Sequence, residues 1–152
     1  MSFADDVDAT PHLAGTLRPG LGALRAQDRE HVTVGQPRSL RGSVDVDGAL
    51  RAVAPEAARW DFVIGQFVGR NGDRRETLHW VEFHSASGSG VVAEMEAKLR
   101  WLIDWMKDTP LRDYRRDIVW VASGESTFTS RDRRLKRLAM LGLRFAGGHL
   151  KI

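Results

Sequence analysis

The sequence predicts a small α/β (α+β) domain in which a mixed sheet, containing a central antiparallel hairpin, is flanked by helices. Three observations lead to this fold class. Two β-rich runs, "WDFVIGQFVG" and "RRETLHWVEFH", are joined by a short turn sequence, residues 91–107 carry apolar residues at helical spacing, and "DIVWVASG" follows as a further apolar strand. Strands and helices in this order are typical of helices packed on a sheet.

The hairpin is predicted from the turn between the two β-rich runs, "RNGD", which contains Asn71 and Gly72. Asn-Gly is the strongest short hairpin signal, because a type I′ turn needs a positive φ at both of its central residues. The two runs are therefore expected to be antiparallel neighbours. Counting outward from the turn places Asp61 opposite Glu82.

The helix predicted over residues 91–107 is expected to cover one face of the sheet, with Trp101 and Trp105 widening its apolar stripe. The stripe consists of Val91, Met95, Leu99, Leu102 and Met106.

Three further helix ends and one strand are expected from local signals. Asp47 is an expected N-cap for a helix before residue 55, and Ser89 is expected near the cap of the helix over 91–107. Thr129 or Ser130 is expected to cap a helix within "RDRRLKRLAMLGLR", and "GGHLKI" is expected to form a last edge strand.

Length and composition indicate one globular domain. At 152 residues, the chain is long enough for one ordinary core. Residues 1–40 are rich in Gly, Pro and polar groups and are expected to form an irregular N-terminal arm, with a single α/β domain over 41–152. The chain has no cysteine, which excludes disulfides and thiolate metal ligands.

Targeting signals are not apparent in the sequence, and we expect a cytoplasmic protein. No apolar run approaches the roughly 18 residues that a membrane-spanning helix needs. Asp5 and Asp6 stand where a signal peptide would carry basic residues, and no apolar h-region follows them.

Positive charge is concentrated in the C-terminal third, although the formal net charge is only +3. Arginine suits phosphate because its guanidinium donates two parallel hydrogen bonds. Two interpretations stay open, a surface that binds nucleic acid and a solvated helix face. The residues concerned are Arg131, Arg133, Arg134, Lys136 and Arg137.

Asp61 and Glu82 are the candidate site residues. If they are directly opposed, their Cβ atoms lie roughly 5 Å apart, and two like charges that close are unfavourable unless a cation or a proton sits between them. His84 shares a strand face with Glu82 and is a candidate third ligand or proton carrier. In the structural alternative, these residues are merely strand ends and Glu82 pairs with Arg59 or Lys98.

The combination of Asp61, an apolar strand, a hairpin, Glu82-x-His84 and a covering helix resembles the PD-(D/E)xK nuclease superfamily. The resemblance spans residues 45–122. It implies a restriction-endonuclease-like fold in which Asp61 and Glu82 hold Mg²⁺ or Mn²⁺ and the metal activates water for attack on a phosphodiester. His84 stands where the superfamily has lysine, and the resemblance implies that Lys98 on the following helix takes that lysine's place.

Two further departures separate this sequence from the superfamily pattern. Trp60 replaces the proline before Asp61, and the strand that normally precedes the Asp-bearing strand is not evident. The stretches "GSVDVDGAL", "RWDFVIG", "HWVEFH" and "KLRWLIDWM" are together also similar to a family of uncharacterised bacterial proteins, which implies no activity.

Two functions are therefore expected from the sequence. The first is a metal-dependent nuclease-like protein, active or relic, in which the arginines of residues 131–137 hold the phosphate backbone. The second is a non-catalytic interaction module, in which the Trp-rich helix over 91–107 binds a second copy of the chain or another protein.

Overall fold

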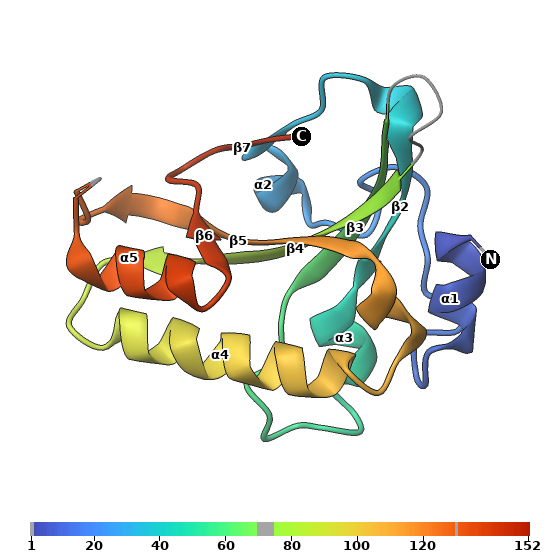
Figure 1. Cartoon of the computed structure of the whole chain (residues 1–152), viewed down its shortest axis with the longest axis horizontal. Coiled ribbons are helices and arrows are strands. Elements are labelled where there is room, and N and C mark those ends of the chain that lie inside the picture. Colours follow the sequence, from blue (N-terminus) through green and yellow to red (C-terminus); the bar gives the residue numbers. More distant parts are fainter. Residues whose placement is uncertain (1, 70–74, 130) are drawn as a thin grey trace.

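The computed structural model describes residues 2–69, 75–129 and 131–152, and its central element is a five-stranded mixed sheet in the order β2-β3-β4-β5-β6 (Figure 1). Strands β2, β3 and β4 are antiparallel neighbours, whereas β5 and β6 run parallel to β4. Helices flank the sheet, so the predicted α/β class is confirmed. The strands are Leu40–Asp45 (β2), Phe62–Val68 (β3), Arg75–Ala86 (β4), Arg115–Ser126 (β5) and Leu143–Phe145 (β6).

The predicted antiparallel pairing of the two central runs is confirmed in its register. Phe62 pairs with Val81, so Asp61 and Glu82 are the next positions along the same two strands. The turn residues Asn71 and Gly72, on which the prediction rested, lie outside the described residues. Strand β2, which the sequence analysis did not find, pairs with β3 on the other side and includes an irregularity between Leu40 and Gly42.

Helix α4 (Val91–Met106) crosses from β4 to β5 and covers one face of the sheet (Figure 1). All five residues of the predicted stripe are buried, because their spacing keeps them on one side of the helix. Trp101 and Trp105 are half-buried beside them. The N-cap is Gly90, without a side-chain hydrogen bond, and Ser89 lies directly before it, near the cap as expected.

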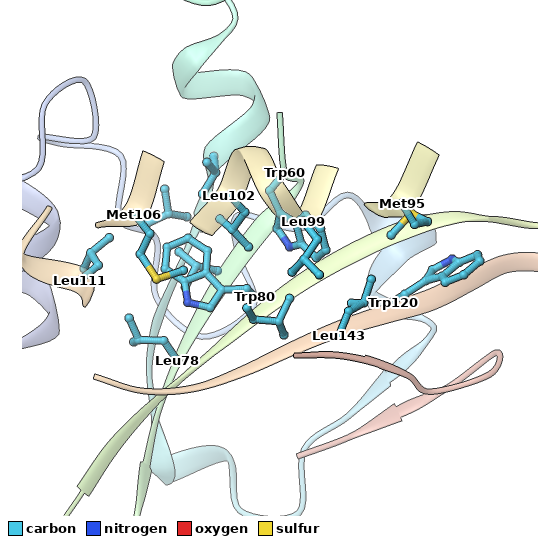
Figure 2. Packing of buried hydrophobic residues seen from close by; sticks show 14 of the residues in the cluster. Trp60, Leu78, Trp80, Met95, Leu99, Leu102, Met106, Leu111, Trp120 and Leu143 are labelled. Atoms are coloured by element: carbon cyan, nitrogen blue, oxygen red, sulfur yellow. The ribbon is translucent and has the colours of Figure 1, made fainter. Parts of the chain in front are cut away.

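The larger of two hydrophobic clusters lies between α4 and the sheet (Figure 2). Trp60, Trp80 and Trp120 are fully buried and face the stripe of α4. Helix α5 (Arg133–Met140) adds Leu138 to the same cluster. The sheet side chains on this face come from alternate strand positions, as the two-residue repeat of a strand requires.

The opposite face of the sheet carries a smaller cluster that includes Phe62, Phe83 and Val121. It is covered by α2 (Ala26–Arg29) and by a two-stranded parallel sheet of β1 (Val32–Thr33) and β7 (Leu150–Lys151) (Figure 1). The C-terminal strand therefore exists, but it pairs with β1, and β6 occupies the edge of the main sheet beside β5.

In place of the irregular arm expected over residues 1–40, the N-terminal segment contains packed elements. Helix α1 (Phe3–Ala9) begins with a reciprocal cap, in which Ser2 and Asp5 bond each other's backbone amides. Phe3 and Val7 are buried in the larger cluster. Gly65 on β3 leaves room for this packing, since a Cβ atom there would lie 2.5 Å from a ring carbon of Phe3.

Two predicted helix caps are corrected by the structure. Helix α3 (Val46–Leu50) is capped by Asp45, which accepts a hydrogen bond from the Gly48 amide, two residues before the predicted Asp47. Helix α5 is capped by Asp132, which accepts from the Arg134 amide. Thr129 is not the cap, and Ser130 lies outside the described residues.

The remaining regular elements are two short 3₁₀ helices, η1 (Pro37–Ser39) and η2 (Pro110–Asp113). Among the described residues, no helix combines the length and apolar character needed to cross a membrane.

Candidate functional site

Asp61 and Glu82 lie side by side where β3 begins, and each carboxylate accepts a hydrogen bond from the other strand. The Asp61 amide donates to Glu82 Oε1 at 3.0 Å, and the Phe83 amide donates to Asp61 Oδ2 at 3.0 Å. The Asp61 carbonyl in turn accepts from the amide of Val46 at the start of α3. Beyond Phe62 and Val81, the last backbone pair of β3 and β4, the two chains are thus joined by hydrogen bonds from amides to carboxylates. These bonds hold both carboxylates in fixed positions.

Lys98 of α4 completes this cluster. Its ammonium lies 3.1 Å from Glu82 Oε2 and donates to the Arg59 carbonyl at 3.0 Å. The Glu82 side chain is only 2% exposed and that of Lys98 20%, so the ion pair is largely removed from water. We refer to Asp61, Glu82 and Lys98 as the carboxylate–lysine cluster.

Burial raises the pKa of both carboxyl groups in the cluster. The pKa of Glu82 rises to about 8, first because the group is desolvated and then because Asp61 is close, and Lys98 offsets only part of this rise. The pKa of Asp61 rises to about 6 through desolvation, which the Phe83 amide and Lys98 partly oppose. Near neutral pH the pair therefore tends to retain a proton.

A second ion-pair group supports the cluster from the side of α3. Asp47 accepts from Arg59 at 2.8 Å and from Arg51 at 2.9 Å. Burial pushes the pKa of Asp47 upward, but the hydrogen bonds from the two arginines hold it below its usual value. Arg59 thus pairs with Asp47 and contributes its backbone carbonyl to Lys98, so Lys98 is the partner of Glu82.

The donor set of the cluster fits a hard cation only in part. Carboxylate oxygens are the ligands that Mg²⁺ and Mn²⁺ prefer, and Mg²⁺ is commonly held by one or two carboxylates, with water and substrate phosphate completing its coordination. In the described part of the chain, however, no group of three or more His, Asp or Glu side chains is placed to hold a metal ion. Any metal here would rest on Asp61 and Glu82.

His84 points to a different neighbour from Glu82. Its Nε2 atom lies 3.1 Å from Glu94 Oε2 at the start of α4, and its Nδ1 atom lies 3.0 Å from the Ser85 carbonyl. With Ser87 and Gly88, these residues line an open cavity of about 600 Å³. His84 is thus placed at the end of β4, bonded away from the carboxylate–lysine cluster.

The predicted basic residues of the C-terminal third lie on α5 or directly before it, and two of them form ion pairs with acidic side chains. Arg134 pairs with Asp132 at 2.9 Å, and Arg137 pairs with Glu96 at 3.1 Å. Arg131, Arg133 and Lys136 are exposed, and no acidic side chain within the described residues lies in ion-pair range of them.

A buried polar network on the opposite face of the sheet was not found from the sequence. The His79 ring lies 2.8 Å from Asp117 Oδ2 and 2.7 Å from Gln66 Oε1, and Arg144 donates twice to Asp117. Burial pushes the pKa of Asp117 upward, but the bonds from His79 and Arg144 hold it well below its usual value. Side chains of β3, β4, β5 and β6 are thereby tied together.

The only signal for this network in the sequence is a histidine within an apolar strand. The sequence does not show that His79 pairs with Asp117, because the register between the parallel strands β4 and β5 is set by packing.

Comparison of the chain with protein-family models, with curated proteins and with solved structures gave no match in any of the three.

Proposed function

We propose that the protein is a metal-dependent, nuclease-like protein acting on DNA or RNA phosphodiesters in the cytoplasm, with the carboxylate–lysine cluster as its centre. One observation carries the proposal. The buried carboxylate of Glu82 and the half-buried carboxylate of Asp61, both with raised pKa values, lie side by side on neighbouring strands, and an ammonium group lies 3.1 Å from Glu82. Groups with strongly shifted pKa values and specific charge partners are typical of functional sites.

In this proposal Asp61 and Glu82 would hold Mg²⁺ or Mn²⁺. A divalent cation supplies two kinds of chemistry at such a site, because it lowers the pKa of bound water and neutralises charge on a phosphate. Asp61 and Glu82 would both have to be ionised to hold the cation, so binding it would displace a proton from the pair. The amino group of Lys98, 3.1 Å from Glu82, would stabilise negative charge that develops on the phosphate.

Two features of the fold support this assignment. Strand β2 precedes the Asp-bearing strand, and its apparent absence was one departure from the PD-(D/E)xK pattern. Lys98 reaches Glu82 from α4, as expected if it takes the place of the lysine that His84 replaces. The proposal gives His84 no part in the cluster, since its ring bonds to Glu94 and to the Ser85 carbonyl.

The decisive experiment incubates the purified protein with plasmid, linear duplex, single-stranded DNA and RNA, in Mg²⁺, in Mn²⁺ and in EDTA. We expect cleavage that depends on the metal and falls at least about 100-fold in Glu82→Gln and in Asp61→Asn, because each change removes an anionic ligand. Glu30→Gln, which alters an exposed carboxylate at the end of α2 on the opposite side of the sheet, is the matched control.

Two results would overturn the nuclease proposal. One is the absence of cleavage of all four substrates in Mn²⁺ by folded protein. The other is cleavage by Glu82→Gln at the rate of the unaltered chain. A thermal shift of the unaltered chain by Mn²⁺ that Glu82→Gln lacks would separately establish metal binding.

A second candidate function, self-association through α4, is favoured by one observation. The rings of Trp101 and Trp105 stack at 5.7 Å with an interplanar angle of 7°, and both remain half-buried, while Ile103 beside them is 38% exposed. Tryptophan is enriched among residues that dominate binding energy. Light scattering on a sizing column tests this candidate, and a dimer that Trp101→Ala converts to monomer is the supporting result.

A further inference from the structure

A second cavity lies beside α5, close to the carboxylate–lysine cluster but not part of it. Its volume is about 640 Å³, within the range of small-molecule sites in proteins. The walls come from α5, from the end of β6 and from the segment before Asp132. They include Phe128, Leu135, Lys136, Ala139, Phe145 and Ala146.

The inner wall of this cavity is aromatic. Phe128 and Phe145 meet edge to face at 5.9 Å, and both pack on the buried ring of Trp120, at 5.6 Å and 4.9 Å. Phe128 and Phe145 are only half-buried, so part of each ring borders the cavity. Leu135 and Ala139 complete an apolar lining that suits a flat, uncharged ring.

The rim of the cavity is basic. Lys136 lies on the lining, and the guanidinium of Arg134 lies 4.9 Å from the centre of the Phe128 ring. Arg131 and Arg133 stand exposed on the adjoining segment, without acidic partners among the described residues. A ligand with a flat ring and an attached negative charge matches both the aromatic wall and this rim.

The cavity is also aligned with the carboxylate–lysine cluster. Glu82 of β4 pairs with Trp120 of β5, and Trp120 pairs with Phe145 of β6, so the three residues form one row across the sheet. With a strand spacing of roughly 4.8 Å, the row places Phe145 about 10 Å from Glu82. One polynucleotide strand is long enough to contact both ends of this row.

We propose that the cavity beside α5 binds an unpaired base of single-stranded nucleic acid, whose flanking phosphates lie on the basic rim. A base in a duplex cannot enter, because its faces are covered by its stacked neighbours. This inference names the substrate class of the proposed nuclease and therefore rests on that function. The protein should therefore bind duplex DNA more weakly than single-stranded nucleic acid.

The test measures fluorescence anisotropy of a labelled single-stranded oligonucleotide and of the duplex of the same length, both in EDTA, so that no cleavage occurs. We expect the single strand to bind at least about tenfold more tightly than the duplex. Ala139→Glu, which puts bulk and negative charge at an exposed position of the lining, should weaken single-strand binding at least about tenfold. Ala26→Glu, at an exposed position of α2, is the matched control and should leave binding unchanged.

Lys136→Ala and Lys151→Ala form a second matched pair, since each removes one exposed lysine and only Lys136 borders the cavity. Lys136→Ala should reduce binding of the single strand and make it less sensitive to salt. Equal binding of strand and duplex, or equal effects of Ala139→Glu and Ala26→Glu, would overturn the inference. Tight binding of a free mononucleotide with none of the oligonucleotide would also overturn it.

The two proposals can fail separately. The base-binding cavity is tested in EDTA with Asp61 and Glu82 unaltered, whereas the nuclease proposal is tested by metal-dependent cleavage. If cleavage is absent while Ala139→Glu still abolishes single-strand binding, the protein is a single-strand binder without nuclease activity. If cleavage is present and duplex is bound as well as single strand, the cavity assignment alone is wrong.

Discussion

At the scale of single residues, Glu82 links the chemistry of the candidate site to the stability of the fold. Its carboxyl group is buried against Asp61 and Lys98, and its pKa is raised to about 8 from an ordinary value of 4.5. Between these two pH values the folded chain retains a proton that the unfolded chain has lost. The free energy of unfolding must therefore fall as the pH rises through this window.

We predict that the protein is less stable at about pH 9 than at about pH 5.5, by roughly 1–3 kcal/mol from this group. Glu82→Gln removes the titrating carboxyl group and should flatten this decline. Urea unfolding at several pH values measures the effect. A decline of the same steepness in Glu82→Gln would show that other groups cause it.

Lys98 provides a second prediction at the same scale. Lys98→Met leaves Glu82 Oε2 without its cation in a buried position, which should cost roughly 2–4 kcal/mol at about pH 9 and less at about pH 6, where Glu82 can take up a proton instead. The double variant Lys98→Met/Glu82→Gln should recover most of the loss. Additive effects in the double-mutant cycle would contradict a direct coupling.

At the scale of elements, α1 is held to the sheet by apolar packing. Phe3 is 1% exposed, and its ring occupies the space that the missing side chain of Gly65 leaves on β3. An isolated helix as short as α1 is not stable in water, so its order depends on this contact.

Phe3→Ala is predicted to lower the free energy of unfolding by roughly 3 kcal/mol, since it opens a cavity between α1 and β3. Chemical denaturation measures the loss. Val53→Ala, at a side chain that is 53% exposed, is the control and should cost less than about 0.5 kcal/mol. A loss no larger in Phe3→Ala than in the control would mean that α1 does not contribute to the core.

At the scale of the whole molecule, the sheet is covered on both faces, and the strands separate the two hydrophobic clusters. Leu150 of β7 is 1% exposed and belongs to the smaller cluster, whereas the buried tryptophans belong to the larger one. A domain of this size normally unfolds in one cooperative step. A substitution that destabilises the packing on one face of the sheet should therefore lower the unfolding midpoint of the whole domain.

Leu150→Ala is therefore predicted to lower the unfolding midpoint reported by tryptophan fluorescence, by an amount equivalent to roughly 2–4 kcal/mol. Met140→Ala, at a side chain that is 89% exposed, should leave the midpoint nearly unchanged. An unchanged fluorescence midpoint in Leu150→Ala, together with a lower midpoint by circular dichroism, would indicate that the β1–β7 layer unfolds separately.

The pairing of Asp61 with Glu82 could be predicted because two antiparallel strands keep one register along their length, so counting outward from Asn71 and Gly72 in the sequence assigns every later pair. The burial of Met95 and Leu99 followed equally from helical spacing. Strand β2 was missed because "LRGSVD" has little β-branched content and contains Gly42, so its extended form depends on pairing with β3.

The sequence by itself determined the α/β class, the central hairpin and its register, and the buried face of α4, since these depend on turn chemistry and on local periodicity. Tertiary structure alone decided that Lys98 meets Glu82, that His84 turns toward Glu94, and that Phe145 lies in one row with Glu82. The physical reason is the same in each case. Where α4 lies on the sheet, and how β5 and β6 align with β4, is set by the packing of side chains distant in sequence, and no local pattern records that packing.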